Sequence, residues 1–466
     1  MSGIRVGWAS CDITPQRKVY LCGQNFERLS EYVRDPLTAT ALALEGGEGG
    51  DQAVILSVDL VVVVRALQEG VAQRLRSSLP EFEASKLIIC ATHTHNAPFE
   101  DYDQFSRLSG GTNGITYEDP EAMPPSEYME QLLDALEKLV IEAWRGRCEG
   151  AVSPAFGYAV VGHNRRANYT DGRAMLYGSP HHDIFKSAES ASDHGVELLY
   201  TWGSSGQLAG IVMNVACPAQ VMEGESFITA DFWAEARARL KLKFGEDLHV
   251  LPLCGAGGDT APHGDLIRAG RKGLEPNMRT AEGMVEIGQR LTELAVSQYT
   301  LAKTRQDANP PLSHSVHFIR LPLRVPKVFE MEYIVADYID KPAEEPARAE
   351  RVRQKVRQRI AEGAAHPYFD AEVHVLRLGE IAIATNPFEL FTDYGLRLKA
   401  LSKANQTFVV QLACDFAAYL PTDKAVRRKG FSAFALDGLV GPEGGHLLVD
   451  TTAALLNEHF EQSARK

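Results

Sequence analysis

Residues 53–64 read AVILSVDLVVVV, a run of β-branched and aliphatic residues that only Ser57 and Asp59 interrupt. A run of this composition predicts a strand that is buried inside a sheet. Residues 66–79 then predict a helix, and KLIICAT at 86–92 predicts a second buried strand. Strands that alternate with helices indicate a parallel or mixed sheet covered by helices.

The same alternation continues along the chain. Helices are expected at 126–144, 232–244, 280–302 and 346–362, and strands at 208–216, 248–254, 372–378 and 381–384. The predicted fold class is therefore α/β, with a mixed β-sheet core covered by helices. A Pro-rich break near 305–312 could separate subdomains, but its composition is not that of a long flexible linker. One catalytic domain over 1–466 is expected.

Charge and composition narrow the function classes. Lys and Arg total 48 against 61 Asp and Glu, a net charge of −13, which disfavours nucleic acid as a partner. The seven cysteines are scattered without a CxxC pair, so no disulfide framework is expected. The first residues show no secretory signal, and no apolar run is long enough for an integral membrane segment. A cytoplasmic, reducing location follows as an expectation.

The motif ATHTHNAP, residues 91–98, carries the strongest local chemical signal. Residues two apart on an extended chain face the same way, so His93 and His95 should project together from a strand end. Imidazole is a good zinc ligand, and metal-dependent hydrolases of several folds carry an HxH motif. Taken alone, a structural pair of histidines explains the motif about as well as a metal site.

Four further segments place polar groups just after apolar runs. Cys217 in NVACPAQ is a potential thiolate ligand, although a buried inert cysteine is the simpler interpretation. Asp259 and His263 follow the glycine-rich turn GAGGD and could serve as polar site groups. Glu389 lies among apolar residues, where a carboxylate needs a partner or a metal unless it is a first-turn acid of a helix. Tyr419 would by default be a core aromatic residue.

Together, the motifs resemble a known family. GWASCDITP at 7–15, VILSVDL, ATHTH, GHNRR, GDTAP, PFELFTDYGLRL and AAYLPT follow one another as in the catalytic domain of the neutral, non-lysosomal ceramidases. The resemblance covers nearly the whole chain. It implies a zinc-dependent amidase whose metal is held by two His, one Glu and one Tyr.

The resemblance assigns roles to individual residues. His93 matches the first zinc histidine, and His95 matches a second-shell or catalytic histidine beside it. Glu389 and Tyr419 match the ligand glutamate and tyrosine. Arg165, in GHNRR, matches an arginine that faces the substrate.

Three positions depart from the family pattern. Cys217 stands where the family has its second zinc histidine. Ala261 replaces a serine, and Phe431 aligns with an active-site tyrosine. The chain also ends about twenty residues beyond Gly445, so the C-terminal immunoglobulin-like domain of the family is expected to be absent. Ceramide is therefore not the expected substrate.

The sequence thus predicts a Zn²⁺-dependent hydrolase that cleaves an amide, or less readily an ester, in a small polar molecule. The expected metal ligands are His93, Cys217, Glu389 and Tyr419, with His95 as the alternative to Cys217. The expected catalytic groups are His95, Arg165, Asp259 and His263, and Asp59 and Asp259 would orient the histidines. A zinc-containing binding protein without catalysis, and a metal-assisted lyase or glycan-active enzyme, remain alternatives. Homo-oligomerisation is left open.

Overall fold

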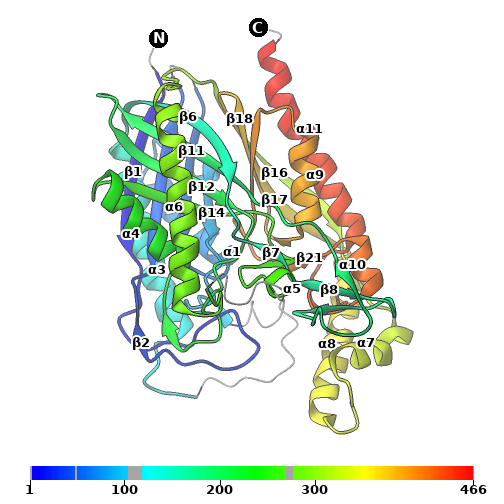
Figure 1. The fold of residues 1–466 in the computed structure, drawn as a ribbon. Helices are drawn as coiled ribbons and strands as arrows, with labels where there is room; N and C mark the ends of the chain where they lie inside the picture. Colours follow the sequence, from blue (N-terminus) through cyan, green and yellow to red (C-terminus); the bar gives the residue numbers. More distant parts are fainter. Residues whose placement is uncertain (1–2, 48–49, 103–117, 269–275, 465–466) are drawn as a thin grey trace.

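The computed structural model describes residues 3–47, 50–102, 118–268 and 276–464, and two β-sheets form its centre (Figure 1). The larger sheet has the strand order β14-β12-β11-β6-β1-β3-β4-β5. Its outermost pairs, β12 with β14 and β4 with β5, are parallel, and the pairs between them are antiparallel. The strands are β1 (Arg5–Asp12), β3 (Thr38–Glu45), β4 (Gln52–Val58), β5 (Leu87–Ala91), β6 (Cys148–Tyr158), β11 (Gly195–Gly203), β12 (Leu208–Val215) and β14 (His249–Cys254).

The second sheet has the order β16-β17-β18-β20 and packs against the first. Its strands are β16 (Leu312–Pro322), β17 (Tyr368–Leu378), β18 (Ile381–Thr385) and β20 (Gln406–Val410). Alternate side chains of the facing strands fill the space between the sheets, among them Leu42, Ile55, Ile383 and Phe408. The chain therefore has a mixed sheet core, as the sequence predicted.

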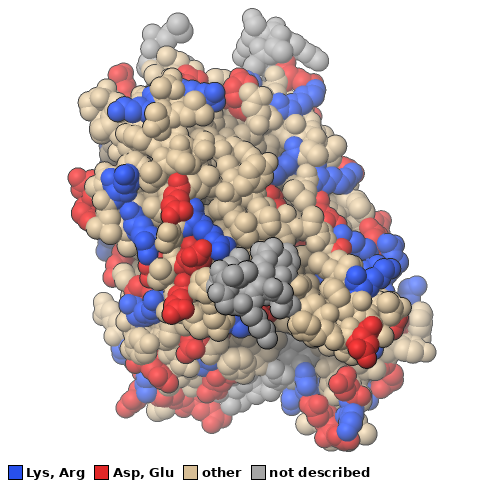
Figure 2. Space-filling view, viewed as in Figure 1, with Lys and Arg blue, Asp and Glu red and all other residues tan. Residues whose placement is uncertain are grey.

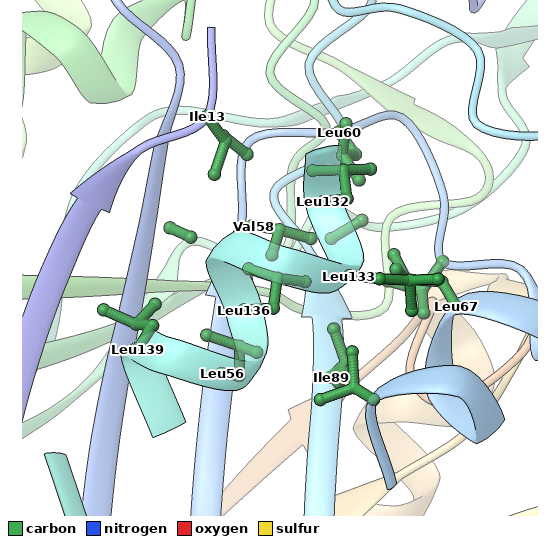
Figure 3. Packing of buried hydrophobic residues seen from close by; sticks show 14 of the residues in the cluster. Ile13, Leu56, Val58, Leu60, Leu67, Ile89, Leu132, Leu133, Leu136 and Leu139 are labelled. Atoms are coloured by element: carbon green, nitrogen blue, oxygen red, sulfur yellow. The ribbon is translucent and has the colours of Figure 1, made fainter. Parts of the chain in front are cut away.

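Helices cover the outer face of each sheet. On the larger sheet, α3 (Pro125–Arg145) lies beside α1 (Arg65–Ser78), and Leu132 and Leu136 of its apolar stripe belong to one cluster with Leu56 and Leu60 (Figure 3). Farther along that sheet, α4 (Phe232–Phe244) packs on α6 (Ala281–Lys303). On the smaller sheet lie α9 (Thr392–Leu401) and α11 (Pro442–Ala464). The ranges of α1, α3, α4 and α6 agree closely with the predicted helices, whereas α9 and α11 were not predicted.

Short elements gather at the end of the sheets opposite the two termini (Figure 1). They are β2 (Tyr32–Val33) with β13 (Phe227–Ile228), β7 (His163–Asn164) with β15 (Thr260–Ala261), β19 (Glu389–Leu390) with β21 (Tyr419–Leu420), the strands β8 (Arg166–Tyr169), β9 (Ala174–Leu176) and β10 (Phe185–Ala188), and the helices α5 (Asp265–Arg268) and α10 (Asp423–Arg428). A helical pair, α7 (Met331–Tyr338) and α8 (Pro346–Ala365), projects beyond this end.

Two predicted elements differ from the structure. The strand expected at 53–64 ends at Val58, because the Asp59 carboxylate accepts from Thr38 N at 2.8 Å and binds Arg237, which turns the buried chain out of the sheet. Glu389 does not begin a helix but lies in the short strand β19, and α9 starts three residues later. In both places local composition predicted the burial but not the direction of the chain.

The Pro-rich segment near 305–312 is tied to the larger sheet. Asp307 exchanges two backbone hydrogen bonds of 2.9 Å with Val152, and Ile4 N donates to Ala308 O. A single domain nevertheless stays a prediction.

Within the described residues, no helix combines the length and apolar character that crossing a membrane requires. On the face seen in Figure 2, acidic and basic side chains are interspersed among uncharged ones.

Candidate functional site

The two histidines of ATHTH lie at the bottom of a cavity just beyond β5. His93 has a left-handed backbone conformation, with φ of 63°. Its Nδ1 is 2.5 Å from the carbonyl oxygen of Val61, and its Nε2 is 3.5 Å from Nε2 of His95. The two rings stand edge to face with centroids 4.9 Å apart. The histidines therefore converge as predicted, but through a turn at His93 rather than through an extended strand.

Glu389 and Tyr419 enter the same cavity as direct neighbours in a parallel ladder, in which β19 pairs with β21. Glu389 Oε2 lies 3.4 Å from His93 Nε2. The backbone of Glu389 is closely approached by Gly258, where a Cβ would lie 2.3 Å from the Glu389 carbonyl oxygen. Burial, followed by the charge of Glu389, raises the pKa of Tyr419 well above its usual value.

Arg165 lies beside Tyr419 in the lining of the cavity. Its backbone N–H donates to Asp259 O at 2.9 Å, next to the ladder that joins GHNRR to GDTAP. Its Nη2 donates to Gly258 O at 3.1 Å and to Tyr419 Oη at 3.2 Å. Its buried Nε has no hydrogen-bond partner among the described residues. Arg165 is thus fixed by the protein against the Tyr419 hydroxyl.

The cavity has a volume of about 160 Å³ and a mixed polar and apolar wall. Gly23 lies against the His95 ring with φ of 99°, and a Cβ there would come within 2.7 Å of the ring, so no larger residue fits. The lining residues are Gly23, Gln24, Asn25, Val61, His93, His95, Arg165, Leu176, Tyr177, Glu223, Glu389, Tyr419 and Phe431.

Glu223 and Tyr177 are site residues that the sequence did not reveal. Glu223 Oε2 accepts from Gln24 Nε2 at 3.0 Å and lies 3.5 Å from His95 Nδ1, and its Oε1 accepts from Tyr177 Oη at 3.3 Å. Burial raises the pKa of Glu223, although Arg165 and Arg279 oppose this shift. Neither residue belongs to a motif with metal or catalytic spacing, so no sequence signal would have found them.

Cys217 does not line the cavity. Its side chain is buried in the hydrophobic cluster beneath α4 and α6, against Gly162, and its Sγ is 3.4 Å from the Pro218 carbonyl oxygen. Burial raises the pKa of the thiol well above its usual value, which disfavours the thiolate. The structure brings His95, rather than Cys217, next to His93.

His263 also lies outside the cavity lining. Its Nε2 is 3.4 Å from Val221 O and its Nδ1 is 3.8 Å from Glu223. Burial lowers its pKa to about 4. It therefore packs behind Glu223 as a neutral ring, and a direct catalytic role is not supported.

The two aspartates expected near the histidines have other roles. Asp259 accepts from Asn164 Nδ2 and from both N and Oγ1 of Thr392, each at 2.8 Å, and so joins the GHNRR segment to the start of α9. Asp59 is bound to Arg237 and Thr38. The expectation that they orient the histidines is wrong, because neither carboxylate contacts an imidazole; Asp259 positions the loop that carries Arg165.

Among the described residues, the group whose ligand atoms all lie within 4.8 Å of one another is outside the cavity and consists of Glu372, His374 and Cys414. Glu372 Oε1 is 3.0 Å from His374 Nε2, and Glu372 Oε2 accepts from Arg65 Nη1 at 2.6 Å. Because a cation already neutralises this carboxylate, a structural ion-pair network explains the group without a metal.

The fold of the chain is similar to that of solved neutral ceramidases. A crystal structure of neutral ceramidase from Pseudomonas aeruginosa is similar, with a TM-score of 0.72 and 17% identity over 98% of this chain and 75% of that one. A structure described as ceramidase complexed with C2 matches with a TM-score of 0.71 and 14% identity, over 99% of this chain and 76% of that one. No protein-family model and no curated protein matches. The chain has the ceramidase fold with a highly divergent sequence.

Proposed function

We propose that the chain is a zinc-dependent hydrolase that cleaves an amide, or less readily an ester, in a small polar substrate. The structural similarity to ceramidases supports the fold, and the convergence of His93, His95, Glu389 and Tyr419 supports a metal centre in it. His95 takes the ligand position for which Cys217 was the first candidate. Arg165 is the substrate-facing cation of this site.

The orientation of the two imidazole rings carries the proposal. The Val61 carbonyl can only accept, so Nδ1 of His93 donates to it and Nε2 is the nitrogen that faces His95 and Glu389. Nδ1 of His95 faces the Glu223 carboxylate, which leaves its Nε2 toward His93. Both Nε2 atoms and the Glu389 carboxylate therefore lie close to His93, where they would stabilise a bound cation.

Two separations suit ligands of one zinc ion. Donors about 2.0–2.1 Å from a tetrahedral zinc are about 3.4 Å apart. The His93–His95 and His93–Glu389 separations are 3.5 and 3.4 Å. Tyr419 lies beside Glu389 in the ladder and would offer a fourth ligand atom.

A bound zinc would act as a Lewis acid toward the scissile carbonyl and make a water molecule more acidic. The protein groups around it bind and orient the substrate. The guanidinium of Arg165 lines the cavity and is already held by Gly258 and Tyr419, so it can stabilise negative charge that develops on the carbonyl oxygen without reorganisation.

The lining of the cavity favours a small polar substrate over ceramide. Phe431 stands at the position of a family tyrosine, and Ala261 is buried in β15 outside the lining. Gln24, Asn25, Tyr177 and Glu223 provide polar groups in the lining, which a small polar molecule would satisfy better than a lipid with two long chains.

The test combines metal analysis with turnover. Purified protein should hold on the order of one zinc per chain. Glu389→Gln and His93→Ala should lose zinc and amide hydrolysis together, whereas His374→Asn, in the other metal-capable group, should keep the zinc. Zinc that disappears with His374 and not with His93 would refute the site. A chain with zinc at His93 but no turnover of any amide would instead be the binding protein, and cleavage without incorporation of water would indicate the lyase.

A further inference from the structure

Glu223 is a largely buried carboxylate whose hydrogen-bonding capacity is not filled. Its side chain is 15% exposed, it accepts hydrogen bonds from Gln24 and from Tyr177, and Nδ1 of His95 faces it at 3.5 Å. A carboxylate has about four lone-pair sites, so at least one remains. Because Glu223 lines the cavity, such a site is within reach of a bound molecule.

No cation of the described residues makes an ion pair of hydrogen-bond length with Glu223. Arg279 Nη1 is 3.8 Å away, while Nη2 of the same guanidinium is 2.6 Å from Asp265. Arg165 is held by Gly258 and Tyr419. A buried carboxylate without a close counter-charge is costly, and a ligand cation would relieve that cost.

The charged side chains of the cavity wall suggest which end of the substrate carries positive charge. Glu389 belongs to the proposed metal centre, which leaves Arg165 and Glu223 as the charged side chains of opposite sign in the lining. Glu223 lies beside Nδ1 of His95, whose Nε2 points to the metal centre. Its carboxylate is therefore one imidazole ring away from the reacting carbonyl.

We propose that Glu223, together with Gln24, forms a subsite for a protonated amine, so that the substrates are small amides that carry an ammonium group close to the scissile carbonyl. This inference rests on the proposed function for the position of the carbonyl. In this arrangement Arg165 binds the carbonyl oxygen and Glu223 binds the ammonium group.

The test uses two amides of nearly equal shape, glycinamide and propionamide, which differ in an ammonium group where the other has a methyl group. Dissociation constants are measured with zinc-loaded protein at pH 7 by ligand-observed NMR titration. A charged hydrogen bond should make glycinamide bind about tenfold or more tightly than propionamide. In Glu223→Gln, this ratio should fall close to one.

Glu225→Gln is the matched control, because it removes the same charge from the same turn at an exposed position and should keep the preference for glycinamide. The inference is overturned if wild-type protein binds glycinamide no more tightly than propionamide, including the case in which neither binds. Loss of zinc in Glu223→Gln would also overturn it, because the residue would then act by holding His95. Failure of the proposed function appears differently, as absent hydrolysis of any amide while the binding ratio is still measured.

Discussion

Replacing Cys217 and His95 separately by Ala distinguishes the two possible metal sets. Cys217 is 1% exposed, lies in an apolar cluster and does not line the cavity. His95 lies 3.5 Å from His93, nitrogen to nitrogen. We therefore expect Cys217→Ala to keep its zinc and nearly all of its activity, and His95→Ala to lose both.

The size of each effect follows from the surroundings. Cys217→Ala removes one buried sulfur atom, comparable to one or two methylenes, so the loss in unfolding free energy should be about 1–2 kcal/mol. An unfolding entropy of about 2.1 cal/mol/K per residue gives about 1 kcal/mol/K for this chain, so Tm should fall by only about 1–2 °C. His95→Ala removes a ligand, and its zinc affinity should fall by more than the roughly 10–100-fold typical of a lost ligand partner.

The assay is zinc content after equilibration in a chelator-buffered zinc series, with Tm and amide turnover measured on the same samples. A Cys217→Ala protein that loses zinc, beside a His95→Ala protein that retains it, would refute the argument from geometry. Cysteine would then be a metal ligand, and the turn at Ala216 to Gln220 would have to differ from the one described.

Three further predictions concern other parts of the molecule. Arg165→Lys should keep zinc but lower kcat/KM by about 10²–10³, because an ammonium cannot reproduce the guanidinium contacts; unchanged kinetics would contradict this. Arg166→Met should lower the free energy of unfolding by about 3–5 kcal/mol in urea titrations, because it leaves Glu189 charged and fully buried; a loss below about 1 kcal/mol would contradict it. Burial lowers the pKa of His249 to about 4, so this side chain binds a proton more readily in the unfolded chain than in the folded one. Acidification from about pH 6.5 to about pH 4 should therefore lower the free energy of unfolding by up to about 3 kcal/mol. His249→Gln should flatten that part of the stability profile, and an unchanged slope would exclude this histidine as its cause.

The sequence predicted much of the fold because apolar periodicity reports burial directly. The stripe with Leu132 and Leu136 identified α3, and the apolar run at 53–64 identified the buried segment around β4. Its end was predicted wrongly, because the turn at Asp59 depends on Arg237, which is 178 residues away. A contact with so distant a partner leaves no local pattern.

The residues of the candidate site were likewise predicted only in part from the sequence. His93, His95, Glu389, Tyr419 and Arg165 were predicted from the motifs, and the structure brings them to one cavity. Cys217 could not be judged from its motif, since only packing decides whether a side chain points into a cavity or into an apolar cluster.

The sequence by itself determined the α/β class, the helices and the residue types available for chemistry, because these follow from local periodicity and composition. Only the tertiary structure decided which of them meet. Glu389 and Tyr419 become neighbours through a ladder between segments thirty residues apart, and Glu223 reaches His95 from another loop. Such contacts depend on how strands pair and loops pack, which is a property of the whole chain rather than of any one stretch.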